Sequence, residues 1–160
     1  MNQLDDLVLR HRSAGLLIDA NLLLLYFVGS TNKQRIPAFK RTQSYAIEDF
    51  ELLTAFVERF AKVVTTPNVL TEVSNLATLH GSELQRFRMV LQTAAEVMEE
   101  HYIESRHAAS DPHFERLGIT DAGISILSER GPLVLTDDLP LYVALCERRI
   151  DAINFNHIRF

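Results

Sequence analysis

Gly15-Leu16-Leu17-Ile18-Asp19 is a short apolar run that begins after a glycine and ends at an acidic residue. A continuous apolar run of this length is typical of a strand that is buried on both faces of a parallel sheet. We expect the next residues, 21–28, to turn into a helix. The run therefore predicts a strand followed by a helix, with Asp19 at the junction between them.

Three further apolar runs predict strands at residues 63–65, 133–135 and 152–155. Helical periodicity and start signals predict helices at residues 48–60, 68–79, 83–102, 120–130 and 139–149. Thr66 and Pro67 give residues 68–79 an N-cap hydroxyl and a proline at the first helical position. Strands that alternate with helices in this way imply right-handed crossovers and a parallel sheet covered on both faces, so the expected fold class is α/β.

Length and composition limit the classes of protein to which the chain can belong. With 160 residues, 47% of them hydrophobic, the chain is expected to form one domain, residues 1–160. A formal net charge of -5 argues against nucleic-acid binding through overall positive charge. The single cysteine, Cys146, is expected in the core and predicts a reducing, cytoplasmic location. The apolar run at residues 22–28 is far too short to cross a bilayer, so no membrane contact is expected.

Acidic residues follow the expected strands or lie in the first turns of the expected helices. They occur in four fragments: Leu-Ile-Asp19-Ala-Asn21-Leu, Thr66-Pro67-Asn68-Val-Leu-Thr71-Glu72-Val, Gly118-Ile-Thr120-Asp121-Ala-Gly and Val-Leu-Thr136-Asp137-Asp138-Leu. Taken alone, an aspartate at such a position is usually a cap or a turn former. Glu72 is different, because its helix has apolar neighbours and an unpaired carboxylate beside buried surface is costly.

In their order, spacing and context the four fragments resemble the acidic motifs of the PIN-domain nuclease family, over nearly the whole chain. The resemblance implies a three-layer α/β/α PIN-like fold with a four- or five-stranded parallel sheet. It also implies that the catalytic, metal-binding carboxylates are Asp19, Glu72, Asp121 and Asp138, with Asn21 and Thr136 orienting them. The last motif of the family, Thr-x-Asp, selects Asp138 over Asp137. Asp137 remains the alternative ligand, or else a cap for the helix that follows.

Convergence of four carboxylates would give an independent reason to expect a cation. Two carboxylates about 5 Å apart repel each other by roughly 3 kcal/mol at an effective dielectric constant of about 20. Ligands that are all oxygen suit Mg²⁺ or Mn²⁺, and such an ion activates water and stabilises charge on a phosphate. The resemblance thus implies a metal-dependent endoribonuclease with an RNA substrate, which leaves 5′-phosphate and 3′-hydroxyl ends. Small bacterial members include toxins that pair with an antitoxin protein, and many members form homodimers.

Residues 29–46 show no clear period, and we expect them to form a long loop insertion. The loop carries four basic residues, Lys33, Arg35, Lys40 and Arg41, while residues 20–47 contain no acidic residue. We therefore expect the loop to lie over the acidic site and contact RNA phosphates, with Phe39 or Tyr45 stacking on bases. A solvated loop without such a role is the alternative.

Two other functions compete with the nuclease. A catalytically inactive family member could serve as an RNA-binding or protein-binding module, although retention of all four carboxylates argues against it. A phosphatase with an aspartyl nucleophile would need Asp-x-Asp on the first strand and a lysine near the later acidic pair. The chain instead has Asp19-Ala20-Asn21, and it has no lysine after Lys62.

Overall fold

A computed structural model describes residues 2–159, in which five strands form one parallel sheet. The strands are β1 (Leu16–Ile18), β2 (Val63–Thr65), β3 (Glu99–Glu100), β4 (Leu133–Thr136) and β5 (Ala152–Asn154). Their order in the sheet is β3-β2-β1-β4-β5. Leu17 at the centre pairs with Val64 on one side and Val134 on the other. The four expected strands and the expected fold class are confirmed, and the sheet has five strands.

The fifth strand, β3, was not predicted. Glu99 and Glu100 were expected to end the helix of residues 83–102, and that expectation is wrong. The helix ends at Val97, and the two glutamates then pair in parallel with Val64 and Thr65 at the edge of the sheet.

The strand order reverses at β1, which places a topological switch point between β1 and β4. From β1 the chain proceeds outward through β2 to β3, then returns across the sheet to β4 on the other side of β1. In open parallel sheets, ligands bind beyond the carboxyl ends of the strands at such a switch point. Here the two strands that flank the switch point, β1 and β4, end at Ile18 and Thr136, and Asp19 and Asp137 follow them directly.

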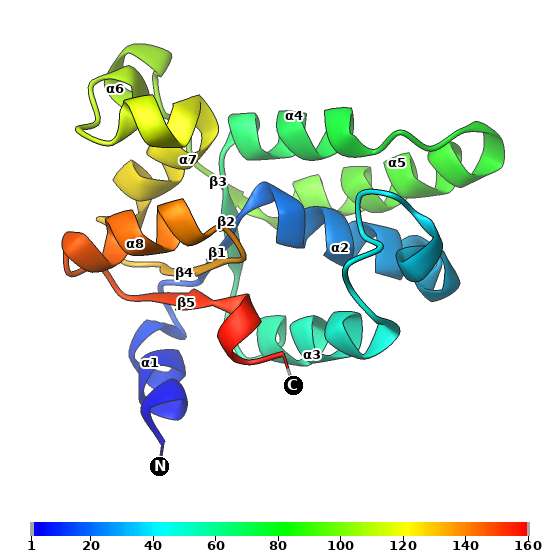
Figure 1. The fold of residues 1–160 in the computed structure, drawn as a ribbon, viewed down its shortest axis with the longest axis horizontal. Helices are drawn as coiled ribbons and strands as arrows, with labels where there is room; N and C mark the ends of the chain where they lie inside the picture. The colour runs from blue at the N-terminus through cyan, green and yellow to red at the C-terminus, as the bar shows by residue number, and fades with distance from the viewer. Residues whose placement is uncertain (1, 160) are drawn as a thin grey trace.

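Helices flank this sheet, as Figure 1 shows. The α-helices are α1 (Gln3–His11), α2 (Ala20–Thr31), α3 (Ile47–Val57), α4 (Pro67–Leu76), α5 (Gly81–Val97), α6 (Ser105–Ala109), α7 (Phe114–Ser128) and α8 (Leu139–Glu147). Two short 3-10 helices, η1 (Lys33–Ala38) and η2 (Phe155–His157), complete the fold. None of the helices in the described part of the chain combines the length and hydropathy needed to cross a membrane.

The segment expected as a loop at residues 29–46 is more ordered than its sequence suggested. Helix α2 continues to Thr31, η1 follows, and residues 39–45 form turns before α3 begins. Gly29 lies at the crossing of α2 and α3, where a Cβ atom would come 2.2 Å from the ring of Phe50. The glycine therefore sets how closely the two helices can approach.

Three helices begin immediately beyond a strand, each with a polar N-cap side chain. Asp19 caps α2 after β1, Thr66 caps α4 after β2, and Asp138 caps α8 after β4. The expected cap and first-position proline at Thr66 and Pro67 are confirmed. These three junctions lie at the carboxyl edge of the sheet and bring polar side chains together there.

Candidate functional site

Asp19 is the most enclosed acidic residue of this edge. Its side chain is 3% exposed and caps α2 by accepting a hydrogen bond from the Leu22 N–H at 2.9 Å. Its second oxygen accepts hydrogen bonds from the Thr136 hydroxyl and from the Asp137 N–H. Burial, reinforced by the charge of Asp137, raises the pKa of Asp19 well above its ordinary value. Thr136 therefore stands where the sequence expected it, in contact with Asp19.

One carboxylate oxygen of Asp137 has a hydrogen-bond partner and the other has none. Its Oδ2 accepts a hydrogen bond from the Tyr45 hydroxyl. Its Oδ1 is, among the described residues, the one buried side-chain oxygen or nitrogen without a hydrogen-bond partner. Buried polar atoms are seldom left unpaired, and those that are often mark a function or a missing ion. This oxygen points to Asp137 as more than a structural residue.

Asp138 starts α8. Its Oδ1 accepts a hydrogen bond from the Leu141 N–H at 2.8 Å, and its own N–H donates to Thr136 Oγ1 at 3.0 Å. The cap considered for Asp137 is thus provided by Asp138. The single hydroxyl of Thr136 connects Asp138 to Asp19, and so ties the end of β4 to the end of β1.

Asp121 and Glu72 reach the same region from α7 and α4. Asp121 lies three residues after Gly118, whose φ of 75° interrupts α7, so the expected helix start near Thr120 is preceded by an extra turn. Burial and then the charges of Asp138, Glu72 and Asp137 raise the pKa of Asp121 to about 7. Repulsion of this kind requires the other three carboxylates to be near, so acidic residues from three distant parts of the sequence share one region, and Asp19 adjoins it through the Asp137 N–H.

The remaining expected site residues lie further from this region or are engaged elsewhere. Asn21 is exposed, and in the described chain its side chain makes no hydrogen bond, so its expected orienting role finds no contact. Lys33 pairs with Glu51 at 3.3 Å, and Arg35 pairs with Glu83 at 3.1 Å. Lys40 and Arg41 are exposed.

Three expectations about individual side chains are wrong. Phe39 and Tyr45 are 3% and 7% exposed, so neither offers a free ring face on which an RNA base could stack. Tyr45 is instead part of the acidic edge, through its hydrogen bond to Asp137. Cys146 was expected in the core and is exposed.

The donor chemistry of the edge fits a hard divalent cation, because every ligand it offers is a carboxylate oxygen. The unpaired Asp137 oxygen and the raised pKa of Asp121 both indicate negative charge that neighbouring cations and hydrogen-bond donors do not balance. Within residues 2–159, however, no three acidic, histidine or cysteine side chains are placed to hold one metal ion. The residue types and charges therefore fit a metal, while the side-chain positions do not form a complete ligand set.

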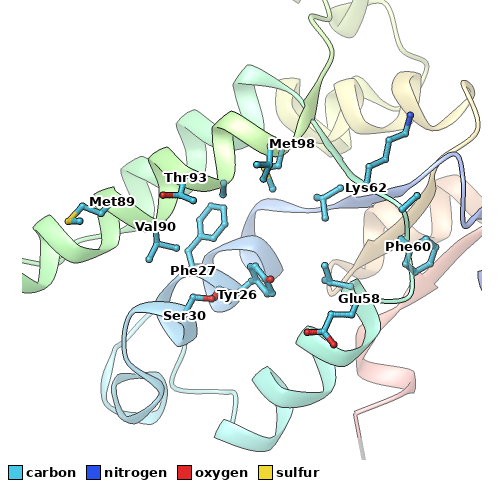
Figure 2. Close-up of a pocket in the computed structure, with 15 residues that line it drawn as sticks. Tyr26, Phe27, Ser30, Glu58, Phe60, Lys62, Met89, Val90, Thr93 and Met98 are labelled. Atoms are coloured by element: carbon cyan, nitrogen blue, oxygen red, sulfur yellow. The ribbon is translucent and has the colours of Figure 1, made fainter.

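A separate cavity of about 670 Å³ lies between α2, α3 and α5. Figure 2 shows Phe27 of α2 pointing toward the helix that carries Val90 and Thr93, and Glu58 and Lys62 are the charged residues of the lining. The lining is otherwise mainly apolar and includes none of the acidic residues described above. The chemistry of this cavity is therefore different from that of the acidic edge.

Comparison with known protein families and with curated proteins does not identify a family for this chain. No family model matches the sequence, and no curated protein matches it either.

Proposed function

We propose that this protein is a ribonuclease of the PIN-domain type that depends on Mg²⁺ or Mn²⁺ and hydrolyses RNA phosphodiester bonds. The observation that carries the proposal is the group of carboxylates at the ends of β1 and β4, in which Asp137 Oδ1 is buried without a partner and the charges of Asp138, Glu72 and Asp137 help to raise the pKa of Asp121 to about 7. A group of carboxylates with this much mutual repulsion is stabilised by a bound cation. The position of the group, beyond the strands that flank the switch point, is where such sheets bind ligands.

In this proposal the metal ligands are Asp19, Glu72, Asp121 and Asp138. The unpaired Oδ1 of Asp137 is a further donor within the same group. Bound Mg²⁺ or Mn²⁺ would supply an activated water and would stabilise negative charge on the phosphate. The protein holds Asp19 in one orientation through Thr136 and two backbone N–H groups, which lowers the cost of ordering that ligand.

The test compares Asp19→Asn with the parent protein on a labelled RNA, with Mn²⁺ or with EDTA. We expect cleavage that requires the metal and leaves 5′-phosphate ends. Loss of a hydrogen-bonded partner of a ligand typically costs 10–100-fold, so loss of the ligand itself should reduce the rate by at least about 100-fold. Asp6→Asn is the matched control, because Asp6 is exposed on α1. Equal cleavage rates for the two variants at saturating Mn²⁺ would show that Asp19 is not a metal ligand of the site.

An inactive binding module is the second candidate, and one observation favours it. In the described chain no three potential ligands are placed to hold an ion. If the module is the correct assignment, the parent protein should bind RNA or a protein partner with equal affinity in Mn²⁺ and EDTA, and no RNA should be cleaved. Cleavage that disappears with Asp19→Asn would exclude it.

Toxin activity with an antitoxin partner, homodimer formation and a cytoplasmic location are finer parts of the proposal. A ribonuclease toxin should arrest growth of a bacterial host when its expression is induced, and the Asp19→Asn variant should not. Growth that is unaffected by the active parent protein would leave the nuclease without a toxin role.

A further inference from the structure

A polar groove of about 590 Å³ lies beside Glu72. Hydrogen-bonding side chains line most of it, and Leu76 and Ile119 add a small apolar part. The full lining is Arg41, Asn68, Thr71, Glu72, Asn75, Leu76, Ile119 and Thr120. Because Glu72 belongs to the lining and Thr120 directly precedes Asp121, the groove leads up to the acidic edge.

Arg41 is the basic residue of this groove, and like the adjacent Lys40, but unlike Lys33 and Arg35, it makes no ion pair within residues 2–159. Lys33 is held by Glu51 and Arg35 by Glu83, so carboxylates already compensate both charges. Over residues 2–159 no ion pair joins Arg41 to another side chain, and Arg41 is exposed. Of the four basic residues between positions 33 and 41, Arg41 is the one that lines a hollow beside an acidic site residue.

We propose that this groove binds the backbone of single-stranded RNA, with Arg41 as its phosphate contact. The inference rests on the proposed function, since it identifies the strand that would lie against Glu72 and Asp121. An arginine donates several N–H groups in a planar fork that matches phosphate oxygens. The groove residues Asn68, Thr71 and Asn75 add neutral donors and acceptors for the sugar and phosphate.

The form of the groove favours a single strand over a duplex. A duplex is recognised across its wide outer surface, along many base pairs, whereas a local hollow accepts a strand that bends into it. No aromatic ring lines the groove, so stacking contributes little and binding depends mainly on charge. Affinity should therefore fall steeply with salt and vary little with base sequence.

The test measures binding of a fluorescent 12-nucleotide single-stranded RNA by anisotropy in EDTA, over a series of salt concentrations. We expect Arg41→Ala to weaken binding by about 5- to 10-fold at low salt, and to lower the slope of log affinity against log salt by about 0.7 for the lost phosphate contact. Lys40→Ala is the matched control, since it removes an exposed charge without an ion pair in the described chain, next to Arg41 but outside the groove lining, and should change affinity less than twofold. Arg41→Lys should retain part of the affinity.

Because EDTA prevents hydrolysis, the result separates this inference from the nuclease assignment. Selective loss with Arg41→Ala supports the groove even if the protein cuts no RNA. Equal effects of Arg41→Ala and Lys40→Ala would attribute binding to the general charge of the segment and overturn the inference. Tighter binding of a duplex than of the single strand would also overturn it, even with nuclease activity intact.

Discussion

Asp121 is the residue at which the electrostatics of the acidic edge can be measured. Its pKa is raised from 3.8 to about 7, first by burial and then by the charges of Asp138, Glu72 and Asp137. The folded protein therefore retains a proton on Asp121 at pH values where the unfolded chain has released it. Asp19, whose pKa is also raised, acts in the same direction.

This difference predicts that, in EDTA, the free energy of unfolding falls as the pH rises from about 4 to about 7. Stability is lost because the folded state must give up a proton that it holds more tightly than the unfolded state. Since one pKa unit corresponds to about 1.4 kcal/mol, the contribution of Asp121 is on the order of 4 kcal/mol at most. Urea unfolding at pH 5 and pH 8 measures it. Asp121→Asn should flatten the dependence and Asp6→Asn should not; an equal dependence in all three proteins would contradict the assigned pKa.

Tyr45 shows what a local sequence cannot reveal about a residue. Its segment has no periodicity, so an exposed ring was as reasonable an expectation as a buried one. The ring is in fact enclosed by Phe155, with ring centres 6.2 Å apart, and by Arg159, whose guanidinium lies 4.5 Å from the ring centre. Both partners come from the end of the chain, and only the assembled fold brings them to Tyr45.

At the scale of elements, the crossing of α2 and α3 depends on one missing side chain. A Cβ at Gly29 would lie 2.2 Å from Cδ2 of Phe50, so either the ring or the helices must move. We expect Gly29→Ala to lower the free energy of unfolding by about 1–3 kcal/mol, as overpacking usually does. Chemical denaturation followed by circular dichroism measures the change.

Gly123→Ala is the control for this crossing. It is also a substitution in a helix, but the nearest atom, Ile103 Cβ, lies 4.0 Å from the added carbon. Helix propensity should then make the variant neutral or up to about 1 kcal/mol more stable than the parent. Equal destabilisation by both substitutions would show that the α2–α3 contact is not specially tight.

The central strands are predictable from the sequence and the edge strand β3 is not, for a physical reason. Residues 16–18 and 133–135 are buried on both faces, and burial imposes an apolar run that can be read directly. Strand β3 consists of two glutamates that pair with β2 through the backbone. The side chain of Glu99 also forms hydrogen bonds with Lys62 and His101. Nothing in a charged pair after a periodic helix indicates a strand, and no glycine or proline marks the end of α5.

For the whole molecule, the grouping of the acidic residues was expected from the family resemblance of the four fragments, and no local residue pattern predicted it. Glu72 lies on α4 and Asp121 on α7. The positions of these helices depend on long connections between strands, and no local sequence pattern predicts how such connections pack. The role of Asp137 was least visible, because the Thr-x-Asp motif selects Asp138 and leaves Asp137 as the alternative ligand or as a helix cap. Packing uses Asp138 as the cap of α8 and leaves one oxygen of Asp137 buried and unpaired, so Asp137 is not the cap.

If these residues form one metal site, Mn²⁺ should stabilise the entire fold at pH 8. A ligand at 100 times its Kd adds about 2.7 kcal/mol to the free energy of unfolding. For a domain of this size that corresponds to a rise in Tm of roughly 5–10 °C. The rise should shrink at pH 6, because the ion must then displace the proton that Asp121 holds there. Glu72→Gln should reduce the rise at pH 8, whereas Asp6→Asn should leave it unchanged. A rise that is the same at both pH values and in both variants would mean that Mn²⁺ binds elsewhere on the protein.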